Sequence, residues 1–101
     1  MFVSRLTFHS IPGKTGEVEH ELQKLRDMVV QAGGSRPRIL HTHFASLGAP
    51  DVVFEQEVPD LATLETQMTQ LTSSPAFQQW SGRMSGLLTQ SPKREVYLVA
   101  D

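Results

Sequence analysis

The sequence predicts an α+β fold in which a four-stranded antiparallel sheet carries helices on one of its faces. Four segments alternate apolar and polar residues, as half-buried strands do, and two longer segments repeat apolar residues at steps of three and four, as amphipathic helices do. Their order along the chain is β-α-β-β-α-β. A length of 101 residues suits one domain, so we assign residues 1–101 to a single domain.

The first segment with strand periodicity is 2–10. One face of this strand would carry Phe2, Ser4, Leu6 and Phe8, and the other face Val3, Arg5, Thr7 and His9. The segment 11–14 is expected to turn, because its proline lacks a donor for the sheet and its glycine accepts turn conformations.

Residues 15–32 are predicted to form the first helix, with Thr15 as its N-cap. The apolar stripe of this helix consists of Val18, Leu22, Leu25, Val29 and Ala32. Gly33 and Gly34 are expected to end the helix, because glycine adopts the left-handed conformation that many C-termini of helices need.

A hairpin follows, with strands at 38–46 and 52–58 joined by a loop at 47–51. In the first of these strands, the helix-covered face is assigned Leu40 and Phe44, and the opposite face Ile39, His41, His43 and Ala45. In the second strand, the helix-covered face is assigned Val52, Phe54, Gln56 and Val58, and the opposite face Val53, Glu55 and Glu57.

The second helical region is predicted to begin at Asp60 as N-cap. It should break at 73–75 and restart with Ser74 as cap and Pro75 in the first turn, where proline is tolerated. The last strand is predicted at 93–99. Its residues Val96 and Leu98 are assigned to the helix-covered face, and Glu95, Tyr97 and Val99 to the opposite face.

Two helical regions with one apolar stripe each can cover only one face of a four-stranded sheet. Right-handed crossovers then favour the ferredoxin-like arrangement, with the strands in the order 4-1-3-2. The residues expected between the sheet and the helices are Leu6, Phe8, Leu40, Phe44, Val52, Phe54, Val96 and Leu98.

The face that the helices leave open mixes apolar and ionisable residues. We expect it to pack against the same face of a second copy, which makes a homodimer through the sheet faces with a wet pocket between them. The short hairpin loop favours a register with two cross-strand pairs on this face, which are His43 with Glu55 and His41 with Glu57. A slip of two residues would change these partners but keep the face.

Four side chains of the open face are candidates for catalysis: His43, His41, Arg5 and Tyr97. Imidazole titrates near neutral pH and suits a general base, guanidinium can hold a carboxylate or phenolate, and a phenol can donate to a ligand oxygen. Nearby candidates for ligand binding are His9, Glu55 and Glu57. In the alternative interpretation, the same side chains have no catalytic role and are interface residues that bond to one another and to water.

Three of these histidines, His9, His41 and His43, could together bind zinc, iron or nickel, which accept imidazole ligands. Histidines two residues apart are also common on strands, and the interface interpretation accounts for them without a metal. We therefore assign no metal and no cofactor.

The order of the elements and two short segments carry a resemblance to a known group of proteins. The segments are Ile11-Pro12-Gly13-Lys14, between the first strand and helix, and Ser74-Pro75-Ala76-Phe77-Gln78-Gln79-Trp80. Over nearly the whole chain, the pattern resembles the dimeric α+β barrel superfamily, above all NIPSNAP-like proteins and antibiotic-biosynthesis-monooxygenase-like domains.

This resemblance implies two protomers packed sheet to sheet, each with a cavity between its sheet and helices or near the barrel mouth. Members include cofactor-independent oxygenases, haem degraders, isomerases and proteins without known activity. Trp80 lies near an aromatic position of the family and becomes a further ligand-binding candidate. Haem degradation is disfavoured, because Ser81 stands where the haem-binding members have their histidine ligand and the chain has no asparagine.

We therefore expect a homodimer that binds a small aromatic or phenolic ligand. One interpretation gives it cofactor-independent monooxygenase-like or isomerase-like chemistry, and the alternative is a non-enzymatic, ligand-binding or stress-related NIPSNAP-like dimer.

Composition excludes several other classes. A net charge of −2 without a basic run argues against nucleic acid and anionic membranes as partners. The absence of cysteine excludes disulfides and thiol chemistry. No apolar run is long enough to cross a membrane, and residues 1–10 lack the layout of a signal peptide, so we expect a cytoplasmic protein.

Overall fold

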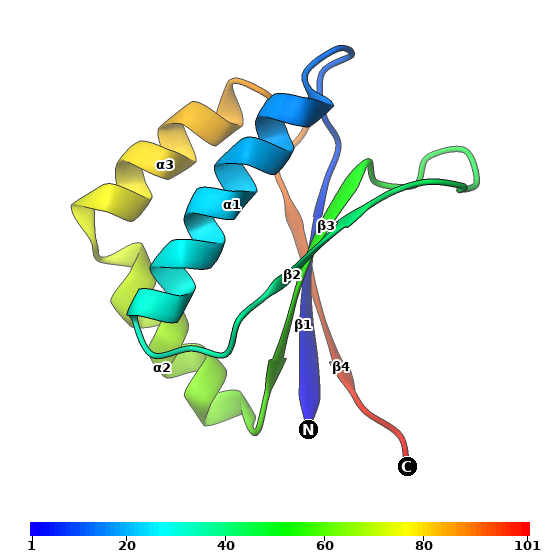
Figure 1. The fold of residues 1–101 in the computed structure, drawn as a ribbon. Helices are drawn as coiled ribbons and strands as arrows, with labels where there is room; N and C mark the ends of the chain where they lie inside the picture. The colour runs from blue at the N-terminus through cyan, green and yellow to red at the C-terminus, as the bar shows by residue number, and fades with distance from the viewer.

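The structure is a computed structural model that describes residues 1–101, and it contains the predicted elements in the predicted order (Figure 1). The second helical region is divided in two, as its central Ser-Ser-Pro sequence predicts. The elements are β1 (Phe2–Phe8), α1 (Thr15–Gln31), β2 (Arg38–His41), β3 (Val52–Val58), α2 (Leu61–Thr72), α3 (Pro75–Ser85) and β4 (Lys93–Leu98).

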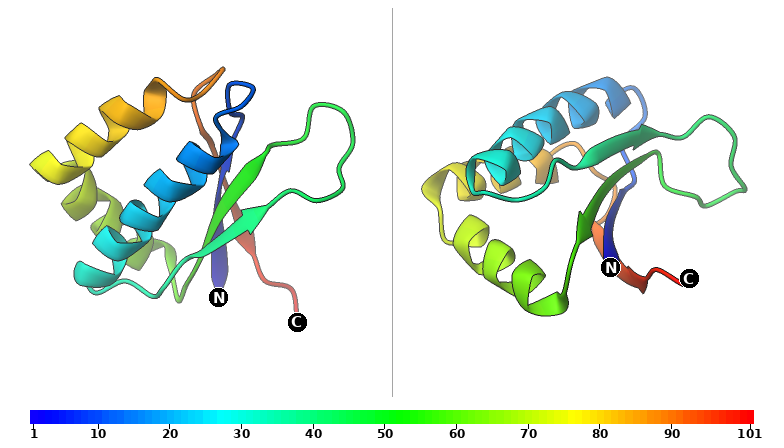
Figure 2. Two further views of the ribbon diagram at one scale, coloured as in Figure 1. Left: turned by 45° about the horizontal axis from the view of Figure 1, so that its top comes forward. Right: turned by 60° about the horizontal axis from the view of Figure 1, so that its bottom comes forward.

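The four strands form one antiparallel sheet in the order β2-β3-β1-β4, which confirms the predicted ferredoxin-like topology. All three helices lie on the same side of this sheet, and its other face is open (Figure 2). No helix of the chain is both long and apolar enough to cross a lipid bilayer.

The core lies between α1, α3 and the two central strands. Four of the five residues in the predicted stripe of α1 pack there, because they recur on one side of the helix. The fifth, Ala32, is exposed, because the helix ends at Gln31. The buried cluster comprises Phe8, Val18, Leu22, Leu25, Val29, Val52, Phe54, Trp80 and Met84.

Helix ends follow the sequence signals with one exception. Asp60 accepts from the main-chain N–H of Thr63, and Ser74 caps α3 with Pro75 in the first turn. Gly33 follows α1 with φ of +88°, a conformation that glycine adopts without strain. The expected cap at Thr15 is wrong: Lys14 holds the N-cap position, and the Thr15 hydroxyl contacts the hydroxyl of Ser10 at 2.7 Å instead.

The hairpin between β2 and β3 differs from the predicted one in its loop and its register. β2 ends at His41, and the residues that follow form a long loop instead of continuing the strand to residue 46. The main-chain N–H of Thr42 donates to Asp51 at 3.0 Å, and its hydroxyl donates to the carbonyl of Pro50 at 2.6 Å. These bonds close a loop at 42–51, which projects away from the helices (Figure 2).

The longer loop changes the register, and with it the faces of β2. Ile39 pairs with Phe54, so Ile39 packs towards the helices. Leu40 turns to the open face, opposite to its predicted side, because a shift of one residue exchanges the two faces of a strand. Phe44, which was expected in the core, lies in the loop with 92% of its surface exposed.

The two predicted histidine–glutamate pairs are consequently wrong. Glu55 lies opposite Arg38, and His41 lies opposite Val52. Glu57 lies beyond the residues of β3 that pair with β2.

The outer part of β4 is also less covered than expected. Val96 pairs with Ser4 and Leu98 with Phe2, so both point to the helix side of the sheet, as predicted. Both remain exposed, at 42% and 68%, because β4 is an edge strand whose main contacts are with β1.

Candidate functional site

The open face of the sheet carries a row of alternating charges that crosses all four strands. The cross-strand pairs place Arg38 beside Glu55, Glu55 beside Arg5, and Arg5 beside Glu95. The Arg5 guanidinium donates to Oε2 of Glu55 at 2.8 and 3.2 Å, and Arg38 donates to the other carboxylate oxygen. The row therefore has no net charge.

Glu55 is the buried member of this row. Only 6% of it is exposed, whereas its partners Arg5 and Arg38 remain open to solvent at 40% and 68% of their side chains. Hydrogen bonds from Arg38 and Arg5 hold the pKa of Glu55 below its ordinary value, and the bond to Glu55 raises the pKa of Arg5. The carboxylate is ionised and paired at neutral pH.

Tyr97 stands at the edge of the same row. Its hydroxyl donates to Glu95, and the Arg5 guanidinium lies 5.3 Å from the centre of its ring. The bond to Glu95 raises the pKa of Tyr97, so the phenol is protonated at neutral pH and acts as a hydrogen-bond donor. Arg5, Glu55 and Tyr97 thus lie near one another on the open face, to which the sequence assigns all three.

The histidines do not join that row. His41 lies at the helix side of the sheet, where its Nδ1 contacts Glu19 of α1. His43 lies in the loop against the ring of Phe44. His9 contacts the carbonyl of Gly48 at 3.2 Å and the side chain of Gln90 at 2.6 Å. No group of three or more histidine or carboxylate side chains has the arrangement of a metal site.

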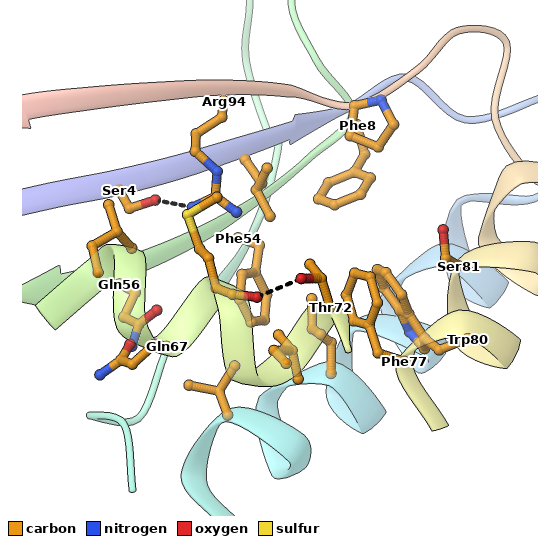
Figure 3. Close-up of a pocket in the computed structure, with 17 residues that line it drawn as sticks. Ser4, Phe8, Phe54, Gln56, Gln67, Thr72, Phe77, Trp80, Ser81 and Arg94 are labelled. Carbon is orange, nitrogen blue, oxygen red and sulfur yellow. Dashed lines mark hydrogen bonds between the residues drawn. The ribbon is translucent and has the colours of Figure 1, made fainter. Parts of the chain in front are cut away.

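A pocket of about 200 Å³ lies on the other side of the sheet, beneath α2 and α3 (Figure 3). It is smaller than the roughly 300–1,000 Å³ of sites for drug-sized ligands, so it suits a compact molecule. Four of its lining residues are exposed and mark its opening, between the α2–α3 junction and β4: Thr72, Ser81, Pro92 and Arg94.

One end of the pocket is aromatic. Phe77 and Trp80 lie at this end, with ring centres 5.4 Å apart, and Phe8 faces them from β1 (Figure 3). Aliphatic side chains from α1 and α2, such as Leu25 and Leu71, complete the apolar lining. Burying flat apolar surface here is favourable, at roughly 25 cal/mol per Å² removed from water.

The other end of the pocket is polar. Gln56 of β3 donates to the side-chain oxygen of Gln67 in α2 at 2.9 Å. Arg94 of β4 donates to the hydroxyl of the buried Ser4 at 2.6 Å, and Figure 3 shows its guanidinium directed towards α2. Burial lowers the pKa of Arg94, which remains cationic at neutral pH.

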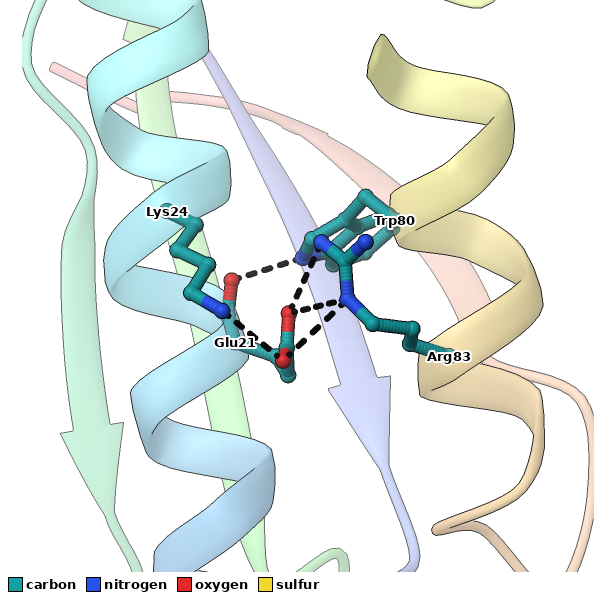
Figure 4. Close-up of polar contacts among 4 residues, drawn as sticks. All are labelled: Glu21, Lys24, Trp80 and Arg83. Carbon is teal, nitrogen blue, oxygen red and sulfur yellow. Dashed lines mark hydrogen bonds and ion pairs between the residues drawn. The ribbon is translucent and has the colours of Figure 1, made fainter.

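Trp80 is held in the pocket wall by a network outside the pocket (Figure 4). Its indole N–H donates to the main-chain carbonyl of Glu21 at 2.6 Å. The carboxylate of Glu21 accepts from Lys24 at 3.2 Å and from Arg83 at 3.4 Å. The network connects α1 to α3 and fixes the orientation of the indole.

The predicted site residues are therefore divided between two faces of the sheet. Arg5, Glu55 and Tyr97 share the open face, whereas Trp80 lines the pocket on the other side. Arg94 and the two glutamines of the polar end, Gln56 and Gln67, are not among the predicted site residues. A signal was present: Arg94 is an arginine at an inward-facing position of the last strand, two residues before Val96.

No protein-family model matches the chain. No curated protein matches it in sequence either. Solved structures do share its fold. An antibiotic biosynthesis monooxygenase is 16% identical with a TM-score of 0.70, and the match covers 100% of both chains. An uncharacterized NIPSNAP domain protein from Burkholderia xenovorans is 20% identical with a TM-score of 0.75, over 99% of this chain and 95% of that one.

A NIPSNAP family protein from Agrobacterium tumefaciens is 15% identical with a TM-score of 0.71, over 99% of this chain and 93% of the other. The predicted resemblance to the monooxygenase-like and NIPSNAP-like structures is thereby confirmed at the level of the fold. Fold alone does not assign an activity.

Proposed function

We propose that the protein binds a small, largely apolar molecule in the pocket between its sheet and its helices. The observation that carries this proposal is the pocket itself, in which ten of the seventeen lining residues are hydrophobic and a few polar groups converge at one end. Pockets of this composition are typical of small-molecule sites. A compact aromatic molecule fits the end formed by Phe77 and Trp80.

A homodimer through the open sheet faces is part of this proposal. Apolar side chains such as Leu40, Val53 and Tyr97 flank the charge row there, and the row itself is internally paired. Two such faces could pack without leaving an unpaired charge at the centre, since Glu55 already has two cationic partners.

Binding can be tested with neutral aromatic probes such as 4-methylphenol and indole. Trp80 is the only tryptophan, so quenching of its fluorescence reports on the pocket, and a thermal-shift assay gives an independent readout. We expect saturable binding that Thr72→Phe abolishes, because this residue lines the opening. Thr69→Phe, on the same helix but outside the pocket, is the matched control. Binding that Thr72→Phe leaves unchanged would place the ligand elsewhere.

Cofactor-independent oxidation is the second candidate, favoured by the fold shared with antibiotic biosynthesis monooxygenase structures. This chemistry also needs a group that accepts a proton from the substrate. The polar side chains that line the pocket are glutamine, serine, threonine and Arg94, and none of them is a general base at neutral pH. We therefore place binding ahead of oxidation or isomerisation. Oxygen uptake with anthrone or a quinol, without added flavin, metal or haem, tests it. Turnover that Thr72→Phe removes would support an enzyme, and absence of turnover would leave the binding function.

A further inference from the structure

The charges that line the pocket are unbalanced. Arg94 is the only charged residue among the lining residues, and no carboxylate accompanies it. Arg5, Arg38 and Arg83 pair with glutamates, whereas Arg94 forms no ion pair. Arg26 and Arg36 form none either, but neither of them lines the pocket. Its protein partner is the neutral hydroxyl of Ser4.

Arg94 also occupies an unusual position for a charge. It lies opposite Leu6 on the helix side of the sheet, in the row that continues through Phe54 and Ile39. Arg94 is exposed at the pocket opening, but the part of its side chain that lies against this apolar row loses hydration, and this loss is compensated when an anion binds it. Partial burial lowers the pKa of Arg94 without any opposing effect from a nearby acid, which fits an unpartnered cation.

The hydrogen-bonding capacity around Arg94 is only partly used. A guanidinium has five N–H donors in a planar fork, and the structure gives this one a bond from Nη1 to Ser4. The Ser4 oxygen accepts that bond, so its own O–H is available as a donor. Two oxygens in one plane can be held by such a fork, which is the geometry of a carboxylate.

From these observations, and on the basis of the proposed binding function, we propose that the ligand is a compact carboxylic acid with an aromatic or other flat apolar body. Its carboxylate binds Arg94 and Ser4, and its body extends towards Phe77 and Trp80. The Gln56–Gln67 amide pair offers a polar contact beside the carboxylate. A phenol presents a single oxygen and is largely neutral near neutral pH, so it fits the arginine less well.

Three probes with the same phenyl body and different head groups test this proposal: phenylacetate, phenylacetamide and 2-phenylethylamine. We expect phenylacetate to bind most tightly and the amine most weakly by calorimetry at neutral pH, with Trp80 fluorescence as the second readout. The affinity for phenylacetate should fall as salt increases, whereas the affinity for the amide should not.

Arg94→Gln should weaken phenylacetate binding about 10- to 100-fold and leave phenylacetamide binding nearly unchanged. Arg94→Lys should recover part of the loss, because it restores the charge without the planar fork. Arg36→Gln removes an exposed arginine outside the pocket and is the matched control.

Two failures can be distinguished. If the amide binds as tightly as the acid, or if Arg94→Gln binds phenylacetate like the wild type, the carboxylate proposal is overturned while the pocket remains a ligand site. If none of the three probes nor a neutral phenol binds, the proposed binding function is overturned together with it.

Discussion

The indole N–H of Trp80 donates to the main-chain carbonyl of Glu21 at 2.6 Å, so one side chain both forms a wall of the pocket and holds α3 against α1. Trp80 is 5% exposed, and the bond is therefore shielded from competing water. Because the indole lines the pocket, the contact that holds it in place also helps to define the shape of the aromatic end.

Trp80→Phe should lower the free energy of unfolding by about 1–3 kcal/mol, because it removes a buried hydrogen bond and part of a large core side chain. Urea denaturation followed by circular dichroism measures the loss. Thr69→Ala, which removes an exposed hydroxyl of α2 outside the pocket, should change stability by no more than about 0.5 kcal/mol. Equal stabilities of Trp80→Phe and the wild type would contradict the role of the contact.

The paired carboxylate of Glu55 should make the protein sensitive to acid. The pKa of Glu55 is lower in the folded state than in the unfolded chain, so its stabilising contribution is full above the unfolded value of about 4.3 and is lost as pH falls through the folded value. Glu55→Gln should be less stable than the wild type at neutral pH by about 1–3 kcal/mol, and the difference should shrink below about pH 4. Thermal melts across this range check the sign, and a constant difference would refute it.

A double-mutant cycle distinguishes the observed hairpin register from the one that the sequence predicts. Arg38→Ala and Glu55→Ala should be coupled by about 0.5–1 kcal/mol, a modest value because Arg38 is mostly exposed. His43→Ala and Glu55→Ala should be additive within about 0.3–0.5 kcal/mol, since His43 lies in the loop. Coupling of Glu55 to His43 instead of Arg38 would contradict the observed register and support the predicted one, with its shorter loop at 47–51.

The proposed dimer gives a fourth expectation. The wild type should sediment as a dimer at micromolar concentration and bury more than about 1,000 Å² in its interface. Val53→Asp places a charge in the middle of the open face and should weaken association at least about 100-fold, because the carboxylate would be buried without a partner. Val30→Asp, on the exposed side of α1, should leave the dimer intact. A wild-type monomer would end this part of the proposal.

The topology could be predicted because it depends on local periodicity. Alternation identifies β1 and β3, the three-and-four spacing identifies α1, and the Ser74-Pro75 sequence explains why α2 and α3 are separate. These signals lie within a few residues of the elements they define, so the wrong assignment of one element leaves the others intact.

The faces of β2 could not be predicted in the same way. They depend on where the loop closes, and the bonds from Thr42 to Asp51 and Pro50 connect residues that local patterns do not relate. The pocket could not be predicted either, because its lining residues come from six of the seven elements and meet only in the folded chain. Arg94 could have been recognised from its inward position, but only once β4 was paired with β1.

The sparse packing of β4 has a consequence for how the pocket exchanges its contents. β4 is paired along one edge with β1 and is exposed at every residue. The opposite wall of the pocket includes Leu25 and Val29 of α1, which belong to the buried core. Such an edge opens at a much lower free energy than the whole domain. Amide hydrogens at the C-terminal end of β4 should therefore exchange with deuterium well before those of β1 and β3. A molecule could enter or leave by transient detachment of this strand, without disturbing the helices.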